Sequence, residues 1–215
     1  MNRIIIKNFV LALVFLSVAS SVWAQDAAQR VTPDDAAKAA LKVGAKMPAF
    51  ELKDSSGKSV KSSDLLKEGN LVVTFYRGSW CPFCNLYLRN LQKRLADINA
   101  AGGKLVAISV ENADASMAVA KKNEVQFTVL SDPNLDLARK FGIVYEMDAK
   151  TDEAYRSRGL DVAKHNGMAK SELPLAVTYV INKKGVITYA FIETDYKKRA
   201  EPDVIIAELK KIVGR

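Results

Sequence analysis

Apolar residues in this chain follow two patterns, which together predict strands that alternate with helices. Residues 71–76 and 105–110 are apolar and rich in β-formers nearly throughout, as is typical of strands covered on both faces. Between them, Leu and Ile recur at helical spacing over residues 82–100, and Gly102 and Gly103 end that helix. The pattern therefore predicts two parallel strands joined by a helical crossover.

The rest of the chain continues this alternation and ends in a hairpin and a helix. The sequence predicts strands at 49–52 and 127–130, a helical start near 63–64, helices over 114–123 and 132–141, hairpin strands over 175–181 and 186–192, and an amphipathic helix over 202–213. Residues 145–172 lack clear periodicity and are predicted to form a long surface insertion. This order indicates an α/β fold with a mixed central sheet and helices on both faces.

Residues 1–24 have the three parts of a secretory signal peptide. Arg3 and Lys7 give a positive start, residues 9–20 are apolar, and small residues precede a cleavage site after Ala24. The apolar run is shorter than the roughly 20 residues that span a bilayer, which argues against a permanent anchor. We therefore expect cleavage after Ala24 and export, to a periplasm or the cell exterior.

The composition is that of one globular domain. The 215 residues are 49% hydrophobic and 26% charged, and no later segment is apolar enough to cross a membrane. Residues 25–44 are predicted to be a leader or short helix, and residues 45–215 the folded domain. The net charge is +8, but basic residues stand mostly singly or in pairs, and the longest run is Lys-Lys-Arg at 197–199. We interpret this run as solvated surface and expect no nucleic-acid partner.

The only two cysteines, Cys81 and Cys84, lie where the first long strand turns into the first long helix. A structural disulfide would close a loop so short that it stabilises by only about 2 kcal/mol, against about 4.7 kcal/mol for a loop of about 100 residues. A zinc site needs four ligands, and the chain adds only His165, which the pattern places in the surface insertion without a catalytic role. Covalent haem attachment needs His where Asn85 stands. No metal or cofactor is therefore expected.

Redox chemistry explains the position of the pair as well as its spacing. Pro82 at the first helical position places Cys81 at the N-cap, where free N–H groups and the helix dipole stabilise a thiolate. Arg77 adds a nearby positive charge. Lowering a thiol pKa from about 8.5 to about 6 raises the thiolate fraction at pH 7 from about 3% to about 90%. Cys84 lies one helical turn further on the same face, where it can capture what forms on Cys81.

Several segments, in order along the chain, carry a resemblance to a known family. They are residues 47–52, 54–58, 63–65, 75–84, 131–133, 137–142 and 178–185. Together they are similar to the peroxiredoxins (the alkyl hydroperoxide reductase and thiol-specific antioxidant family), and residues 75–84 resemble the active-site loop of its redoxin branch. The resemblance covers roughly residues 44–213. It implies a thioredoxin-like fold with a peroxiredoxin-type N-terminal extension, and it makes Cys81 the peroxidatic cysteine.

The resemblance also implies substrates, partners and neighbouring site residues. Substrates would be hydrogen peroxide or organic hydroperoxides, the reductant would be an external dithiol such as a thioredoxin-like protein, and relatives often pair as homodimers. A peroxide site needs a hydroxyl and a cation near the thiolate. Arg77 is the candidate cation. The other residues expected to shape the site are Thr74, Ser79, Trp80 and Pro82.

Two mechanisms use the same nucleophile and differ in the electrophile. In a thiol peroxidase, Cys81 attacks the O–O bond and Cys84 resolves the sulfenic acid to an intramolecular disulfide. In an exported thiol–disulfide oxidoreductase of thioredoxin type, Cys81 forms a mixed disulfide with a protein substrate and Cys84 resolves it. The family resemblance favours the first mechanism, and the Cys-x-x-Cys spacing favours the second. A non-catalytic binding module would need the cysteine pair to be incidental.

Overall fold

The computed structural model describes residues 30–214, so the predicted signal peptide and its cleavage site lie outside the described residues. The strands are β1 (Glu51–Asp54), β2 (Ser59–Lys61), β3 (Asn70–Tyr76), β4 (Gly103–Ser109), β5 (Thr128–Ser131), β6 (Val144–Glu146), β7 (Glu172–Pro174), β8 (Thr178–Ile181) and β9 (Ile187–Phe191). The helices are α1 (Pro33–Ala39), α2 (Ser62–Glu68), α3 (Pro82–Lys93), α4 (Leu95–Ala100), α5 (Ala113–Lys122), α6 (Asp136–Lys140), α7 (Ala149–Arg156), α8 (Val162–His165) and α9 (Pro202–Val213). Within this part of the chain, none of the helices combines the length and apolar character that a membrane crossing requires.

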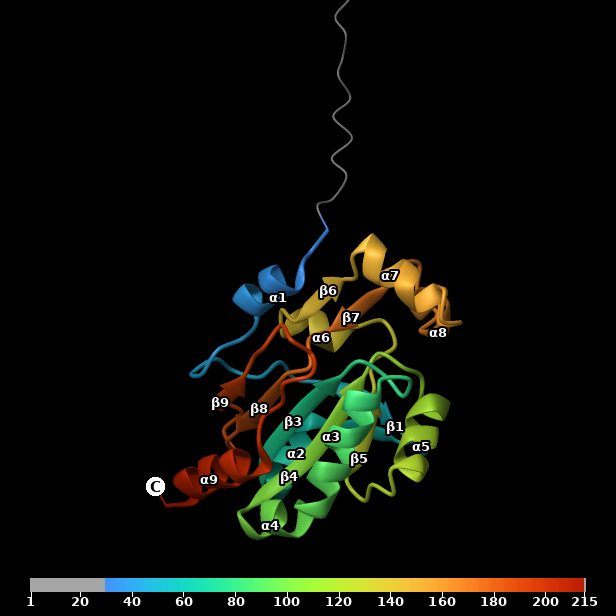
Figure 1. The fold of residues 1–215 in the computed structure, drawn as a ribbon. Coiled ribbons are helices and arrows are strands. Elements are labelled where there is room, and N and C mark those ends of the chain that lie inside the picture. The colour runs from blue at the N-terminus through green and yellow to red at the C-terminus, as the bar shows by residue number, and fades with distance from the viewer. Residues whose placement is uncertain (1–29, 215) are drawn as a thin grey trace, which may run out of the picture.

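Seven strands form the central sheet in the order β2-β1-β5-β4-β3-β8-β9 (Figure 1). The three inner strands β3, β4 and β5 run parallel, and every other pairing in the sheet is antiparallel. Along β3 and β4 the register runs from Asn70 opposite Gly103 to Tyr76 opposite Ser109. The sheet is therefore mixed, as the sequence predicts.

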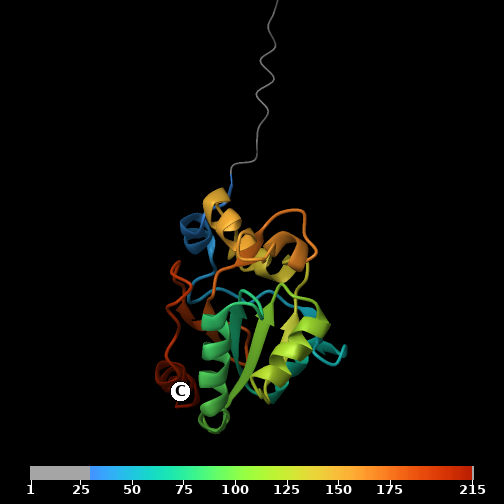
Figure 2. The ribbon, with the colours of Figure 1, turned by 45° about the vertical axis from the view of Figure 1, so that its right-hand side comes forward.

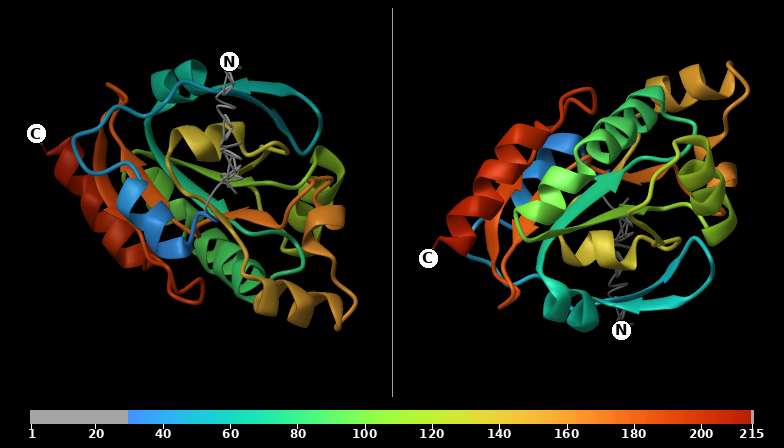
Figure 3. Two further views of the ribbon diagram at one scale, coloured as in Figure 1. Left: turned by 90° about the horizontal axis from the view of Figure 1, so that it is seen from above. Right: turned by 90° about the horizontal axis from the view of Figure 1, so that it is seen from below.

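Strand β3 is buried along its whole length because both of its faces are covered. Leu71, Val73 and Phe75 point into one apolar cluster, which also contains residues of α1 and α6. Val72 and Tyr76 point into the other cluster, with residues of α3, α4 and α9. Figures 2 and 3 show the same layering, with α3 and α9 on one side of the sheet and α6 on the other. The two cores explain why this strand carries an almost unbroken apolar run.

The described part of the predicted leader packs on the domain. Helix α1 begins with a capping box, in which Thr32 and Asp35 each bond the other's backbone N–H. Ala36 and Ala40 are buried in the core beside α6. Just after α1, the N–H of Leu41 donates to the carbonyl oxygen of Phe141 at 3.0 Å. This helix therefore closes one face of the sheet.

The single helix predicted over residues 82–100 is two helices. Helix α3 ends at Lys93 and α4 begins at Leu95, with Arg94 between them at φ −108° and ψ 10°. The guanidinium of Arg94 bonds Asp97 at 2.7 Å and Asp203 at 2.6 Å. Ile98, which follows the break, is buried in the same apolar cluster as residues of α9, and its apolar spacing continues that of α3, so spacing alone does not reveal the break.

The insertion predicted over residues 145–172 is ordered rather than irregular. It holds β6, α7 and α8, and it ends in β7, which pairs antiparallel with β6 in a small second sheet. Of the strand predicted over 175–181, only Thr178–Ile181 (β8) forms a strand, and β7 ends just before the predicted segment begins. Figure 1 shows α7 and α8 above the end of the central sheet where β3 and β4 finish. This segment therefore covers the end of the sheet at which the cysteines lie.

Gly142 tests how tightly α1 is held against the domain. Its φ is +72°, and an added Cβ would lie 2.5 Å from the carbonyl oxygen of Ala39. We expect Gly142→Ala to lower the free energy of unfolding by about 2–4 kcal/mol, since backbone strain and a backbone clash coincide. Gly159→Ala is the matched control, because Gly159 has φ +84° with open space around it. It should cost only about 1–2 kcal/mol in the same urea titration; equal losses would contradict the close packing of α1.

Candidate active site

Cys81 lies at the start of α3, where the loop that follows β3 turns into the helix. It is the N-cap residue, Pro82 is the first helical residue, and the N–H of Asn85 donates to the Cys81 carbonyl at 3.1 Å. Cys84 follows within the first turn. Both cysteines are free thiols and both are buried, at 1% and 0% exposure. The predicted placement of the pair at a strand–helix junction therefore agrees with the structure.

The loop between β3 and α3 is shaped by Gly78. Its φ is +148°, and a Cβ at this position would lie 2.5 Å from Nε1 of Trp80. Only glycine allows the Trp80 ring to fold back over the loop in this way. The ring consequently lies against Arg77, with 4.9 Å between its centroid and the guanidinium carbon.

Arg77 is a buried cation surrounded by aromatic rings. Its side chain is 2% exposed, and its guanidinium carbon lies 5.7 Å from the ring centroid of Tyr155 and 4.1 Å from that of Tyr196. Nη2 donates to the hydroxyl of Tyr155 at 3.3 Å. Nε and Nη1 have no hydrogen-bond partner among the described residues. Aromatic faces stabilise the charge, and two donors remain for an oxygen that reaches the site.

A buried carboxylate, Glu111, holds the same loop from the other side. It lies just beyond β4, is 1% exposed, and accepts from the N–H of Ser79 at 2.7 Å and from the Ser79 hydroxyl at 2.6 Å. Nε2 of His165, at the end of α8, lies 2.8 Å from the same carboxylate. The Ser79 hydroxyl is thus engaged by Glu111. His165 is exposed, as the sequence predicts, but it ends the short helix α8 rather than lying in a loop, and it contacts this carboxylate.

Asn85 connects the loop to the body of the protein. Its amide nitrogen donates to the carbonyl oxygens of Ser79 at 2.7 Å and of Cys81 at 3.2 Å. Its amide oxygen accepts from Asn123 at 2.8 Å. The loop is therefore fixed by side chains on both sides of the first cysteine.

The pKa values of the two thiols are shifted in opposite directions. A hydrogen bond from the Cys84 thiol holds the pKa of Cys81 below its ordinary value; burial opposes this shift, and Arg77 and Arg199 reinforce it. Burial raises the pKa of Cys84 well above its ordinary value, and the neighbouring Cys81 sulfur raises it further. The two shifts therefore favour a thiolate at Cys81 and a thiol at Cys84.

Thr74, which the sequence also placed in the site, bonds elsewhere. Its hydroxyl lies 3.2 Å from the carbonyl oxygen of Val177 and 3.0 Å from the hydroxyl of Thr178, across the pairing of β3 with β8. Thr178 in turn lies 3.2 Å from the hydroxyl of Tyr87, which donates to the carbonyl oxygen of Ala200 at 3.0 Å. These bonds tie α3 to the sheet, and none of them reaches a sulfur atom.

Of the site residues predicted from the sequence, those that lie together around the cysteine pair are Cys81, Cys84, Arg77, Trp80 and Pro82. Sequence reasoning missed Glu111, His165, Tyr155, Tyr196 and Arg199. Glu111 alone had a readable signal, since it follows a predicted buried strand at the same sheet edge as Cys81. Among the described residues, no group of three or more His, Cys, Asp or Glu is placed to hold a metal ion.

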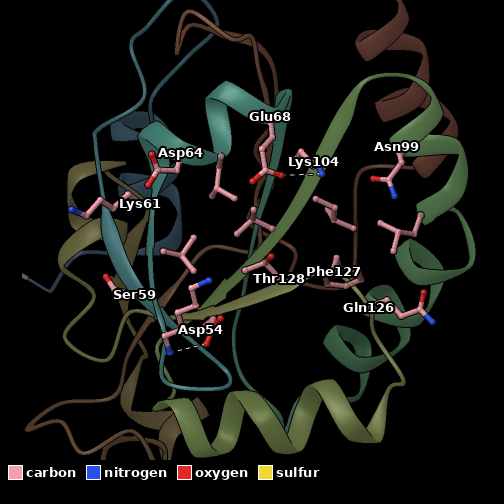
Figure 4. A pocket seen from close by; sticks show the side chains of 16 residues that line it. Asp54, Ser59, Lys61, Asp64, Glu68, Asn99, Lys104, Gln126, Phe127 and Thr128 are labelled. Atoms are coloured by element: carbon pink, nitrogen blue, oxygen red, sulfur yellow. Dashed lines mark hydrogen bonds and ion pairs between the residues drawn. The ribbon is translucent and has the colours of Figure 1, made fainter.

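A separate cavity of about 410 Å³ lies on another part of the molecule (Figure 4). Its wall is formed by α2, β2, β4 and their neighbours, and it includes Asp54, Asp64, Glu68, Lys104 and Thr128. Glu68 and Lys104 form an ion pair at 3.0 Å across it. No residue of the loop 77–84 lines this cavity, so it is distinct from the cysteine site.

Comparison with known proteins identifies the family. The model of the AhpC/TSA family matches residues 43–190, which is more than half of the chain. The chain belongs to the AhpC/TSA family. Peroxiredoxin Q of Triticum aestivum (chloroplastic) is 28% identical to it over 170 residues, covering 79% of this chain and 65% of that protein. Peroxiredoxin Bcp of Escherichia coli K12 is 25% identical over 171 residues, covering 80% of this chain and 97% of that one.

Solved structures of proteins named peroxidoxin and peroxiredoxin share the fold. The peroxidoxin BcpB structure from Mycobacterium tuberculosis superposes with a TM-score of 0.65 at 20% identity, covering 80% of this chain and 98% of that chain. A peroxiredoxin Q structure from Xanthomonas campestris gives a TM-score of 0.59 at 18% identity, covering 75% and 90%. The predicted thioredoxin-like fold is therefore confirmed. The chain spans about 65% of the length of the first plant relatives, Triticum aestivum and Populus jackii peroxiredoxin Q.

Glu111 offers a test of how this AhpC/TSA-family protein holds its active-site loop. Glu111→Ala removes a buried acceptor of three hydrogen bonds, so we expect the free energy of unfolding to fall by about 3 kcal/mol. Glu68→Ala is the control, because its ion pair with Lys104 is exposed and should contribute less than about 1 kcal/mol. Urea titration measures both. A loss at Glu111 no larger than at Glu68 would contradict an anchoring role.

Proposed function

We propose that this protein is a thiol-dependent peroxidase, in which Cys81 reduces hydrogen peroxide or an organic hydroperoxide. The observation that carries the proposal is a thiol of lowered pKa, Cys81, beside a thiol of raised pKa, Cys84. Both lie near Arg77, a buried cation in which two nitrogen atoms donate no hydrogen bond within the described part of the chain. Membership of the AhpC/TSA family and the likeness to proteins named peroxiredoxin Q and peroxiredoxin Bcp support it. The oxidised form is a disulfide between Cys81 and Cys84, and no cofactor takes part.

In the first step the Cys81 thiolate attacks the nearer peroxide oxygen. A sulfur–oxygen bond forms, the O–O bond breaks, and the distal oxygen leaves as an alkoxide or hydroxide that takes a proton to give alcohol or water. Negative charge therefore grows on the distal oxygen. Nε and Nη1 of Arg77 are the unbonded donors available to stabilise that charge.

In the second step Cys84 attacks the sulfenic acid on Cys81. A sulfur–sulfur bond forms, the sulfur–oxygen bond breaks, and hydroxide leaves with the proton of the Cys84 thiol as water. An external dithiol, such as a thioredoxin-like protein, then reduces the disulfide through a mixed disulfide. One catalytic cycle thus consumes one peroxide and one dithiol.

Thiol–disulfide exchange is the second candidate function, and one observation favours it. Cys81 and Cys84 occupy the N-cap and the first turn of α3, which is the Cys-x-x-Cys arrangement of thiol–disulfide oxidoreductases. The same nucleophile and resolving thiol serve both reactions. Only the electrophile distinguishes them.

Location and assembly extend the proposal. We propose export to the periplasm, because residues 1–24 have the charge, apolar run and cleavage site of a signal peptide. An oxidising compartment would suit a redox-active cysteine pair with an exported dithiol partner. A homodimer stays a prediction drawn from the peroxiredoxin resemblance.

The peroxidase is tested by steady turnover of hydrogen peroxide with dithiothreitol or thioredoxin as reductant. We expect the native protein to turn over peroxide. Cys84→Ser should still do so with dithiothreitol, whereas Cys81→Ser should not, because only Cys81 reacts with the peroxide. The measurements are the rate of peroxide consumption and the amount of sulfenic acid formed on Cys81 in the Cys84→Ser variant. Negligible consumption together with rapid reduction of insulin disulfides would reject the peroxidase in favour of exchange.

The pH dependence of the first step tests the role of Arg77. Only the thiolate reacts, so the rate falls as pH decreases through the pKa of Cys81. Because that pKa is lowered, we expect the rate near pH 7 to be close to its plateau. Arg77→Met removes a cation that favours the thiolate, and the profile should move to higher pH by about one unit. The matched control is Arg139→Met, whose exposed guanidinium bonds Glu172 at 2.6 Å and should leave the profile unchanged. An unshifted profile in Arg77→Met would contradict the role of this cation.

A further inference from the structure

Cys84 is a buried thiol that must become an anion during the cycle. It is 0% exposed, and burial raises its pKa well above the ordinary value. When it attacks an oxidised Cys81, it loses its proton, and when the disulfide is reduced by attack on Cys81, it leaves with the electron pair. Both events place negative charge on a sulfur that water does not reach. A buried anion of this kind needs a cation beside it.

The structure places one cation against this sulfur. Nη2 of Arg199 donates to Sγ of Cys84 at 3.5 Å, and its charge acts to lower the pKa of that thiol. Arg199 lies in the segment between β9 and α9, 115 residues further along the chain. It therefore reaches the redox pair from an element that the active-site loop does not include.

Other bonds hold the Arg199 guanidinium in this position. Nη1 donates to the carbonyl oxygen of Lys198 at 2.8 Å and to that of Tyr196. The guanidinium carbon lies 5.7 Å from the ring centroid of Tyr87, which is itself buried on α3. A guanidinium held by these contacts stays directed at the sulfur.

Arg199 differs from the basic residues beside it. Lys197 is exposed, and Lys198 forms an exposed ion pair with Glu193 at 3.3 Å. Arg199 alone turns inward, to partial burial against Cys84. The interpretation of the whole 197–199 run as solvated surface is therefore wrong at its last residue.

We propose that Arg199 is a catalytic residue of the resolving step, stabilising the anionic sulfur of Cys84 as it bonds to Cys81. This inference rests on the proposed function for the identity of the oxidant. The bond changes are those already given, with water as the leaving product. Arg77 and Arg199 then act in different steps of the cycle. Arg77 stabilises the negative charge that develops on the peroxide oxygen, and Arg199 stabilises the negative charge that develops on Cys84.

Single-turnover kinetics separate the two steps. Reduced protein is mixed with one equivalent of hydrogen peroxide above the pKa of Cys81, and quenched samples are assayed for sulfenic acid and disulfide. We expect Arg199→Gln to slow disulfide formation at least about tenfold, so that more sulfenic acid accumulates, while sulfenic acid formation changes less than about threefold. Arg199→Lys should restore part of the rate. Lys197→Gln removes the same charge from an exposed site and should match the native protein.

A second arm measures attack by Cys84 without peroxide. Methyl methanethiosulfonate converts the Cys81 thiolate to a methyl disulfide and releases methanesulfinate. Cys84 then displaces methanethiolate and closes the intramolecular disulfide, which mass spectrometry follows. Arg199→Gln should slow this closure by a similar factor. It should also shift the pH dependence of the closure rate to higher pH, which a general loosening of the fold would not do.

The outcomes distinguish this inference from the proposed function. Native-like closure in Arg199→Gln, in both arms, overturns the role of Arg199. A native protein that closes its disulfide from the methyl disulfide but forms no sulfenic acid with peroxide overturns the peroxidase instead. If Arg199→Gln does not fold, Arg199→Met decides by the same criteria, because it keeps an apolar stem and removes the cation, and native-like closure in it would overturn the proposal.

Discussion

The constraint on which this site depends is one negative charge placed on one of two buried sulfur atoms. Cys81 and Cys84 have similar burial, and water stabilises neither anion. The thiol of Cys84 donates to Cys81 and thereby favours a thiolate there, while the same interaction keeps Cys84 protonated. Two arginines from distant parts of the chain complete the balance. In the function we propose, this asymmetry makes Cys81 the nucleophile and Cys84 the resolving thiol.

The fold supplies this asymmetry through its topology. The parallel strands β3 and β4 end at the same edge of the sheet, so the cysteine loop after β3 meets Glu111 just beyond β4. The segment holding α7 and α8 covers that edge and brings Tyr155 to Arg77 and His165 to Glu111. The segment before α9 brings Arg199 to Cys84. The groups around the cysteine loop are therefore positioned by separate elements of the fold rather than by the loop itself.

What the sequence could predict is what local pattern determines. The apolar run of β3, Pro82 and the spacing of the cysteines are contiguous, and they placed the nucleophile at a helix start. The partners of the site are not contiguous, since 32 residues separate Ser79 from Glu111 and 115 separate Cys84 from Arg199. Periodicity also cannot show which member of a basic run turns inward, nor that Arg94 interrupts a helix whose apolar spacing continues past it.

The most direct test of the central claim is a pH titration of the reduced protein that counts thiolates per chain by their ultraviolet absorbance. We predict that a single thiolate is present near pH 7, that it is lost in Cys81→Ser, and that the second thiol ionises only at much higher pH. Two thiols that ionise together at the pKa of free cysteine, about 8.5, would contradict the account.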